Sequence, residues 1–232
     1  MKKLPIGQTG LSVTPICFGT SSLGNMPDTY GYDVSEDRAR QTLDAIFDGP
    51  VNFLDTSNNY GFGRSEQRVG DAIKARGGLP EGFVISTKLD RDMETGGFDA
   101  DRARKSLEES LTRLNLDRVG VLHLHDPEYA ADLSEITGKG GALETLFKMK
   151  EEGLADAVGL AMGRIDMMFP LLRDNPFDAI ISHNRFTLLN RSADEMFSHA
   201  ADRDIAILNA APYAGGVLAK GSEAMPMITY QP

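Results

Sequence analysis

A chain of 232 residues, 41% of them hydrophobic and 25% charged, has the composition of an ordinary globular protein, which excludes a disordered or fibrous one. Its formal net charge is −10 and it contains no Lys/Arg cluster that could follow a phosphate backbone, so a nucleic-acid partner is not expected. Apolar runs stay well short of the roughly 18 residues of a membrane span, and the first residues show no signal-peptide pattern. We expect a cytoplasmic protein without a membrane partner.

The predicted elements begin with a short β-hairpin, because residues 4–6 and 11–13 flank a turn that contains Gly7 and Gly10. Short apolar runs then alternate with amphipathic runs, as in a parallel sheet covered by helices. The predicted strands lie at residues 16–18, 52–55, 83–87, 119–124, 157–160, 179–182 and 205–208. The predicted helices lie at residues 35–48, 64–76, 101–114, 143–152, 165–173 and 193–202.

This alternation predicts an α/β fold that either stays open as a doubly wound sheet or closes into a barrel. Closure in the (β/α)8 TIM-barrel design uses eight strands, whereas the pattern supplies seven. We expect a single barrel domain over residues 1–232, with the N-terminal hairpin at one end and the last strand and helix missing from the given chain. A polar loop at residues 25–34 is placed to cover a site.

Polar residues follow or end several of the predicted strands. Asp55 ends the second strand, Lys88 the third and His125 the fourth, while Tyr60 lies five residues beyond Asp55. Singly, each has an ordinary structural explanation as a turn brace, a surface lysine, a loop anchor or a core histidine. Together they would meet at one mouth of a parallel barrel, where an unpaired buried charge would be costly. The four residues therefore predict an active site.

Four segments resemble aldo-keto reductases. Residues 52–61 (NFLDTSNNYG) resemble the segment in which an aspartate precedes the catalytic tyrosine by five residues, and residues 63–66 (GRSE) resemble the motif that often follows. Residues 84–88 (VISTK) resemble the family's lysine strand, and residues 121–127 (VLHLHDP) its histidine strand. The resemblance runs from residue 4 to about residue 218. It implies an oxidoreductase that uses NADP or NAD and acts on a small carbonyl, alcohol or sugar.

The resemblance also implies a role for each of the four residues. Tyr60 would donate a proton in carbonyl reduction and accept one in alcohol oxidation. Lys88 would lower the tyrosine pKa from its ordinary value of about 10, Asp55 would orient Lys88, and His125 would hydrogen-bond the substrate oxygen. Hydride transfer would belong to the cofactor.

The sequence departs from the family where the nicotinamide is usually held. Ala161 and Met162 replace the serine and asparagine of a G-x-S-N motif, His183 replaces a glutamine, and Ala210 replaces the stacking tyrosine. We expect other residues to bind the nicotinamide ring, with Asn184 or Asn209 supplying part of the carboxamide contact. The expected cofactor contacts are Gly19, Thr20, Asp55, Asn184, Asn209, Pro212, Gly215 and Leu218. The family's phosphate-binding segment would lie beyond the last residue, so NAD and NADP are not distinguished.

Residues 184–189 (NRFTLL) and 209–216 (NAAPYAGG) resemble the sugar-oxidising branch of the family, which contains aldose, fucose and galactose dehydrogenases and a related pyridoxal dehydrogenase. This predicts a dehydrogenase for a sugar or a similar polar substrate. Residues 25–32 and Phe62 are the candidate substrate walls. The oligomeric state stays open.

Two alternatives stay open as well. His123 and His125 lie two apart on a predicted strand and share a face, as in metal-dependent barrel hydrolases, with Asp126 or Asp55 to complete a metal site. A non-catalytic barrel remnant that acts as a binding subunit is the other. We predict no metal ligands.

Overall fold

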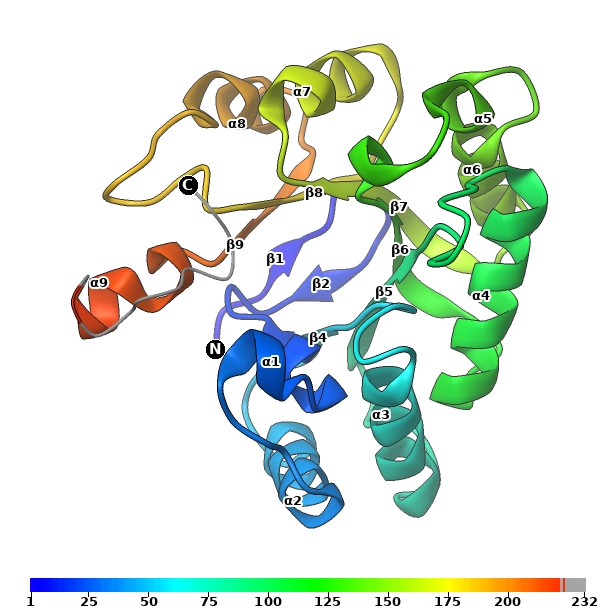
Figure 1. Ribbon diagram of the computed structural model, residues 1–232. Coiled ribbons are helices and arrows are strands. Elements are labelled where there is room, and N and C mark those ends of the chain that lie inside the picture. Colours follow the sequence, from blue (N-terminus) through cyan, green and yellow to red (C-terminus); the bar gives the residue numbers. More distant parts are fainter. Residues whose placement is uncertain (222, 224–232) are drawn as a thin grey trace.

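The computed structural model describes residues 1–221 and 223 of the chain and shows one curled sheet of seven parallel strands, surrounded by helices (Figure 1). The strands pair in sequence order, from β3 to β9. They are β3 (Phe18–Gly19), β4 (Phe53–Asp55), β5 (Val84–Leu89), β6 (Val119–His125), β7 (Ala155–Met162), β8 (Ala179–His183) and β9 (Ala206–Ala210). The predicted fold class is confirmed, and the described residues contain no eighth parallel strand.

Helices follow the strands as predicted. The main ones are α2 (Glu36–Phe47), α3 (Arg64–Ala75), α4 (Ala100–Leu114), α6 (Ala142–Glu151), α7 (Ile165–Asp174) and α8 (Asp194–Ala201). Short helices occupy the loops: η1 (Ser21–Gly24), α1 (Pro27–Tyr30), η2 (Pro127–Tyr129), α5 (Leu133–Thr137), η3 (Ala214–Gly216) and α9 (Val217–Lys220). None of the helices within the described residues is long and apolar enough to cross a membrane.

Local signals explain where the main helices begin and end. The Ser35 hydroxyl accepts a hydrogen bond from the Arg38 N–H at the start of α2, and the Asp99 carboxylate accepts one from the Arg102 N–H at the start of α4. Helix α4 ends at Asn115, which adopts the left-handed conformation common at helix ends.

Some strands extend further than their apolar runs. β5 continues through Leu89 and β6 through His125, past the predicted ranges 83–87 and 119–124, and Lys88 and His125 lie at the strand ends as predicted. The physical reason is the ladder between neighbouring strands, in which Lys88 aligns with His123 and His125 aligns with Ala161. Inward-facing polar residues are compatible with a strand at the barrel mouth, which composition alone does not reveal.

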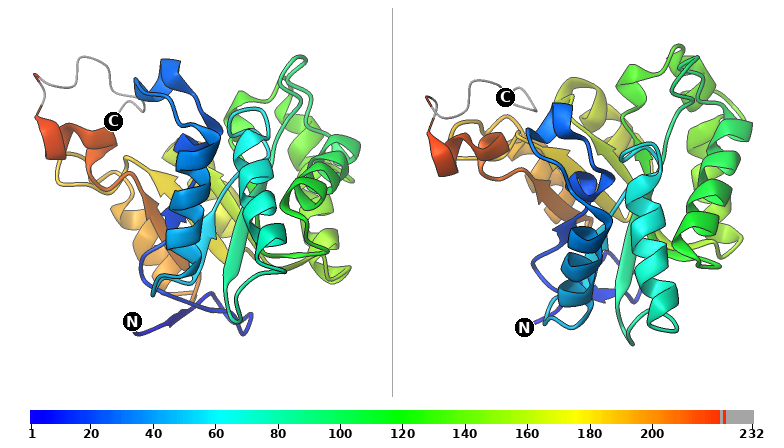
Figure 2. Two further views of the ribbon diagram at one scale, coloured as in Figure 1. Left: turned by 90° about the horizontal axis from the view of Figure 1, so that it is seen from below. Right: turned by 60° about the horizontal axis from the view of Figure 1, so that its bottom comes forward.

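The N-terminal hairpin consists of β1 (Leu4–Pro5) and β2 (Ser12–Val13), which pair antiparallel. It lies at one end of the barrel, opposite α1 and α9 (Figure 2). Ile6 and Val13 pack against the deepest inward-facing side chains of five strands, which are Phe53, Val84, Val121, Ala157 and Ala179. The hairpin therefore closes the bottom of the barrel, as predicted.

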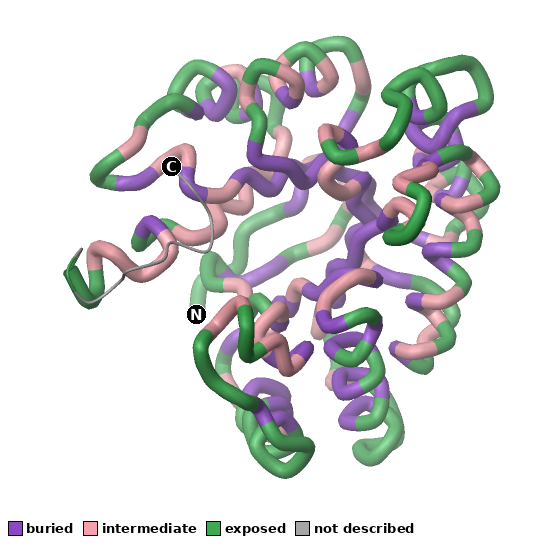
Figure 3. The backbone as a smooth tube through the Cα atoms, in the orientation of Figure 1, coloured by how far each residue is buried: buried purple, intermediate pink, exposed green. Residues whose placement is uncertain are grey.

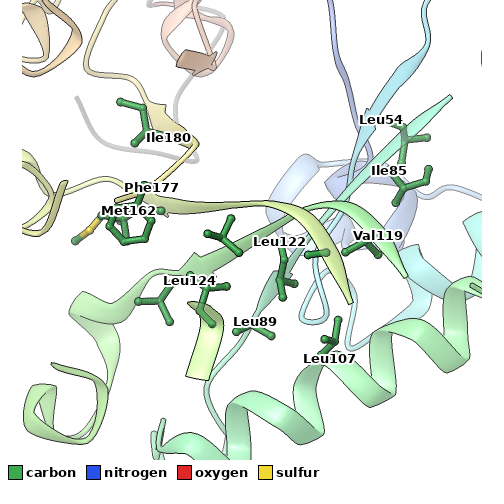
Figure 4. Packing of buried hydrophobic residues seen from close by; sticks show 14 of the residues in the cluster. Leu54, Ile85, Leu89, Leu107, Val119, Leu122, Leu124, Met162, Phe177 and Ile180 are labelled. Atoms are coloured by element: carbon green, nitrogen blue, oxygen red, sulfur yellow. The ribbon is translucent and has the colours of Figure 1, made fainter. Parts of the chain in front are cut away.

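The larger core lies between the sheet and the helices. Outward-facing side chains such as Leu54, Ile85 and Leu122 pack there, and Figure 4 shows part of this layer. Strands β5 to β8 are the most continuously buried part of the chain (Figure 3). Because successive strand residues alternate between faces, burying these residues outward turns Asp55, Lys88 and His125 into the barrel.

Candidate active site

Lys88 is the centre of a hydrogen-bonded cluster at the barrel mouth. Its ammonium nitrogen lies 2.6 Å from Asp55 Oδ2, 2.6 Å from the Thr56 carbonyl oxygen and 3.2 Å from the Tyr60 hydroxyl oxygen. The Lys88 side chain is only 2% exposed, and that of Asp55 is 14% exposed. The three N–H donors of Lys88 are thus matched by three acceptors, which fixes the ammonium beneath the phenol.

The loop after β4 places Tyr60 over this ammonium. Gly61 has φ = 63°, and a Cβ added there would lie 2.1 Å from the Gly24 carbonyl oxygen. Only glycine permits both the left-handed backbone and this close approach of η1. The Tyr60 N–H donates to the Ser57 carbonyl, and the Ser65 N–H donates to the Tyr60 carbonyl. The tyrosine therefore lies on a bonded turn.

One electrostatic expectation is wrong. Burial, followed by the negative charge of Asp55, raises the pKa of the Tyr60 phenol well above its ordinary value, whereas we expected Lys88 to lower it. The Lys88 ammonium is largely compensated by the Asp55 carboxylate 2.6 Å away, so little net positive charge acts on the phenol. At neutral pH Tyr60 is a protonated phenol, the form that donates a proton.

His125 faces Tyr60 across the mouth. The two rings meet edge to face, with centroids 6.0 Å apart and an interplanar angle of 84°. Asp90 was not among the residues predicted from the sequence. Its Oδ1 atom lies 2.7 Å from His125 Nδ1. Its signal was its position two residues after Lys88, which on an extended strand turns both side chains to the same side.

The Asp90–His125 pair shifts both groups toward their charged forms. Burial acts against the Asp90 carboxylate, but His125 and the Ser57 hydroxyl outweigh it and lower the Asp90 pKa. Burial also acts against the imidazolium of His125, but Asp90 and Asp126 outweigh it and raise the His125 pKa. Neither pKa shift could be predicted from the sequence, because Asp90 and His125 are 35 residues apart.

A cavity of about 590 Å³ opens above these residues, within the size range of small-molecule sites. Asp55, Tyr60, Lys88 and His125 all contribute to its lining. The predicted substrate walls also line it, through Met26, Thr29, Tyr30, Tyr32 and Phe62. The four predicted catalytic residues and the predicted loop therefore share one cavity.

The strands β7 to β9 form the opposite wall, which is mostly apolar. Its lining residues are Ala161, Met162, Ile181, His183, Ala210 and Ala211. Gly19 and Asp55 are the expected cofactor contacts that line the cavity; the lining among the described residues does not include Thr20, Asn184, Asn209, Pro212, Gly215 or Leu218.

Of these six, Thr20 and the two asparagines lie on or beside the strands. Thr20 is fully buried and its hydroxyl donates to the Asp55 carbonyl. Asn184 is 1% exposed, and the Asn209 amide donates to the Phe186 carbonyl.

His123 points into the barrel one layer below His125. It is fully buried, and its ring fills the space left by Gly159, where an added Cβ would lie 2.2 Å from His123 Nδ1. Neither ring nitrogen has a hydrogen-bond partner within the described part of the chain, and burial, followed by the charge of Lys88, lowers the His123 pKa well below its ordinary value. Among the described residues, no three His, Cys, Asp or Glu side chains are grouped to hold a metal ion.

Comparison with known proteins agrees with this geometry. The Aldo/keto reductase family matches residues 15–230, so the chain belongs to that family. It is similar to the L-galactose dehydrogenase of Arabidopsis thaliana, with 33% identity over 92% of this chain and 66% of that protein. It is also similar to the D-threo-aldose 1-dehydrogenase of a Pseudomonas species, with 29% identity over 91% of this chain and 69% of that protein.

A solved structure of an aldo-keto reductase is also similar to this chain. A Pseudomonas aeruginosa protein assigned to the aldo-keto reductases superimposes with a TM-score of 0.73 and 28% identity, covering 89% of this chain and 77% of that one. The chain spans about two thirds of the length of the two dehydrogenases.

Proposed function

We propose that this protein is a nicotinamide-dependent oxidoreductase that interconverts an alcohol or a sugar hemiacetal with the corresponding carbonyl compound or lactone. The observation that carries the proposal is the buried cluster in which Lys88 binds both Asp55 and the Tyr60 hydroxyl on the floor of a cavity. The names of the two similar dehydrogenases, which act on a galactose and on aldoses, support a sugar or a similar polar substrate.

Tyr60 is the proposed proton-transfer group. Its hydroxyl oxygen accepts the Lys88 hydrogen bond, which leaves its own proton for a substrate oxygen in the cavity. His125 is the second group at that oxygen, on the other side of the cavity floor. In carbonyl reduction, Tyr60 gives its proton to the substrate oxygen, and the raised pKa keeps the phenol protonated until then.

The proposed cofactor is NADP or NAD, and the volume of the cavity, about 590 Å³, is within the range of small-molecule sites. When bound, the cofactor supplies or takes up the hydride. We propose that the nicotinamide lies against the apolar β7–β9 wall, which includes Ala161 and Ala210, and His183 is the polar side chain on that wall. The remaining expected contacts, Asn184 among them, stay part of the proposal.

A titration and a screen test this function. Protein fluorescence is followed as NADH and NADPH are added, and sugars, pyridoxal and simple alcohols are then screened for oxidation with each oxidised cofactor. We expect saturable binding of at least one cofactor and turnover of a polar alcohol or hemiacetal. Absence of cofactor binding would overturn the proposal.

The same assays separate the alternatives. Activity that survives in the presence of a chelator and requires a nicotinamide cofactor argues against the metal-dependent hydrolase, whereas loss on chelation favours it. Cofactor binding without turnover of any substrate favours the binding subunit. A single domain over residues 1–232 and a cytoplasmic location remain predictions.

A further inference from the structure

The Nδ1 atom of His125 is surrounded by acceptors. Asp90 Oδ1 lies 2.7 Å from it and Ser57 Oγ lies 3.2 Å from it. The Ser57 hydroxyl donates its proton to Asp90 Oδ2 at 2.5 Å, so its oxygen turns a lone pair toward the ring. The Asn59 N–H donates to the same carboxylate oxygen at 3.1 Å. Asp90 is therefore held as an ionised acceptor, and Nδ1 must carry a hydrogen.

The other ring nitrogen lies on the side of Asp126. His125 Nε2 is 3.7 Å from Asp126 Oδ2, beyond hydrogen-bond distance, and both residues line the cavity. In a neutral imidazole only one nitrogen carries a hydrogen. A hydrogen on Nδ1 thus leaves Nε2 as an acceptor on the cavity side.

We propose that Asp90 is a positioning residue that holds His125 in the Nδ1–H tautomer, so that the neutral imidazole offers Nε2 as an acceptor to a substrate hydroxyl. This inference rests on the proposed function only for the identity of the ligand. The tautomer itself is a property of the protein alone.

The neutral and charged forms of His125 suit different ligands. A hydroxyl group can accept a hydrogen bond from Tyr60 and donate one to Nε2, so it matches neutral His125. A carbonyl oxygen only accepts, so it matches the imidazolium, whose Nε2 carries a hydrogen. Passing upward through the His125 pKa should therefore favour hydroxyl ligands over carbonyl ligands.

Several other titratable groups face the His125 ring or influence its pKa, and their effects must be distinguished from that of Asp90. These groups are Asp126 in the turn after β6, Lys88 on β5, Tyr60 in the loop after β4 and His183 on β8. Asp126 is the natural comparison, because it also carries a negative charge but lies near the opposite nitrogen.

Nitrogen NMR of the ligand-free protein tests the tautomer directly. The ring signals of His125 are assigned with His125→Gln and followed from pH 5 to pH 9. We expect the neutral ring to show a protonated Nδ1 and an unprotonated Nε2. A neutral ring protonated on Nε2 in the wild-type protein would overturn the inference, whatever the variants do.

Two variants then distinguish orientation from charge. Asp90→Ala frees the Ser57 hydroxyl to donate to Nδ1, so we expect the tautomer to move toward Nε2–H and the pKa to fall. Asp126→Ala removes an equal charge, so we expect a lower pKa with the tautomer unchanged. An unchanged tautomer in a folded Asp90→Ala protein contradicts the role of Asp90. Asp101→Asn, at an exposed position of α4, is the control for folding.

A kinetic measurement connects the tautomer to the substrate. With an alcohol and carbonyl pair found by the oxidation screen, KM for the alcohol should fall with rising pH while KM for the carbonyl rises. In Asp90→Ala the neutral ring should keep its hydrogen on Nε2, so both transitions should become much smaller or disappear. Parallel KM trends for the two ligands would contradict the inference. Failure to bind any nicotinamide would instead count against the proposed function and leave the NMR result standing.

Discussion

The two walls of the cavity are built on different principles. On the β4–β6 side, Asp55, Lys88, Asp90 and His125 form a buried network in which each charged group has a partner within 2.7 Å. The β7–β9 side offers mainly the side chains of alanine, methionine and isoleucine. A proton must be transferred along a fixed direction, which requires bonded and oriented groups, whereas a flat ring can be held by shape. The polar wall is thus preorganised for the proposed proton transfer, and the apolar wall is where we propose that the nicotinamide lies.

The strongest challenge to the polar wall is Tyr60→Phe. The substitution removes the proposed proton donor but leaves the ring in place, and general acid catalysis typically contributes about 10²–10⁴-fold to the rate. We expect kcat to fall by that order while the affinity for NADH or NADPH, measured by fluorescence, stays nearly constant. Unchanged turnover would refute the assignment of Tyr60.

Lys88→Met tests whether the same wall also contributes to stability. It leaves the Asp55 carboxylate without its cation, and breaking a buried pair costs about 3–5 kcal/mol. Urea unfolding should show a loss of this order, and activity should be lost as well. Lys105→Met is the control, because the Lys105 side chain is 68% exposed and its substitution should change stability by about 0.5 kcal/mol or less. Equal effects of the two variants would mean that the cluster does not stabilise the fold.

Gly159→Ala tests the layer where the two walls meet beneath the cavity. The added methyl would lie 2.2 Å from His123 Nδ1 and 2.7 Å from the Ala179 carbonyl oxygen. Overpacking of this kind costs about 1–3 kcal/mol, and the same urea experiment measures it. At Gly19, an added methyl meets no atom within 4 Å, so Gly19→Ala should unfold like the wild-type protein. A neutral Gly159→Ala variant would show that His123 has room to move.

Ala161→Ser, on the apolar wall, should have the smallest effect of these substitutions and would sharpen the contrast between the two walls. It restores the serine that relatives with the G-x-S-N motif use on this wall. One net hydrogen bond contributes about 0.5–1.5 kcal/mol, so the cofactor dissociation constant should fall by about two- to tenfold. Ala157→Ser, deeper in the barrel against the hairpin, should leave this constant unchanged. Weaker cofactor binding in Ala161→Ser would mean that the apolar surface of this wall itself contributes to cofactor affinity.

The sequence was enough to predict that Asp55, Lys88 and His125 lie together, because a parallel barrel gathers its strand ends at one face. Asp55, Lys88 and His125 each end an apolar run, so a correct strand order was enough to bring them together. Their shared lining of one cavity with Tyr60 agrees with this. Each residue was located by its position at the end of an apolar run, which is a local feature visible in the amino-acid sequence.

Asp90 and the Tyr60 pKa could not be predicted in the same way. Asp90 has no apolar run or motif to mark it, and its partner His125 lies 35 residues away. The pKa of Tyr60 depends on the balance between desolvation, Asp55 and Lys88, and proximity of the lysine alone suggested the wrong direction.

By itself, then, the amino-acid sequence determined the order of strands, the closing hairpin and the four polar residues at the mouth, because hydrophobic periodicity and strand ends are local properties. Only the tertiary structure decided which charges neutralise each other, which nitrogen of His125 is free and how His123 fits against Gly159. Those outcomes depend on distances of a few ångströms between strands and loops, and on the burial that such packing creates.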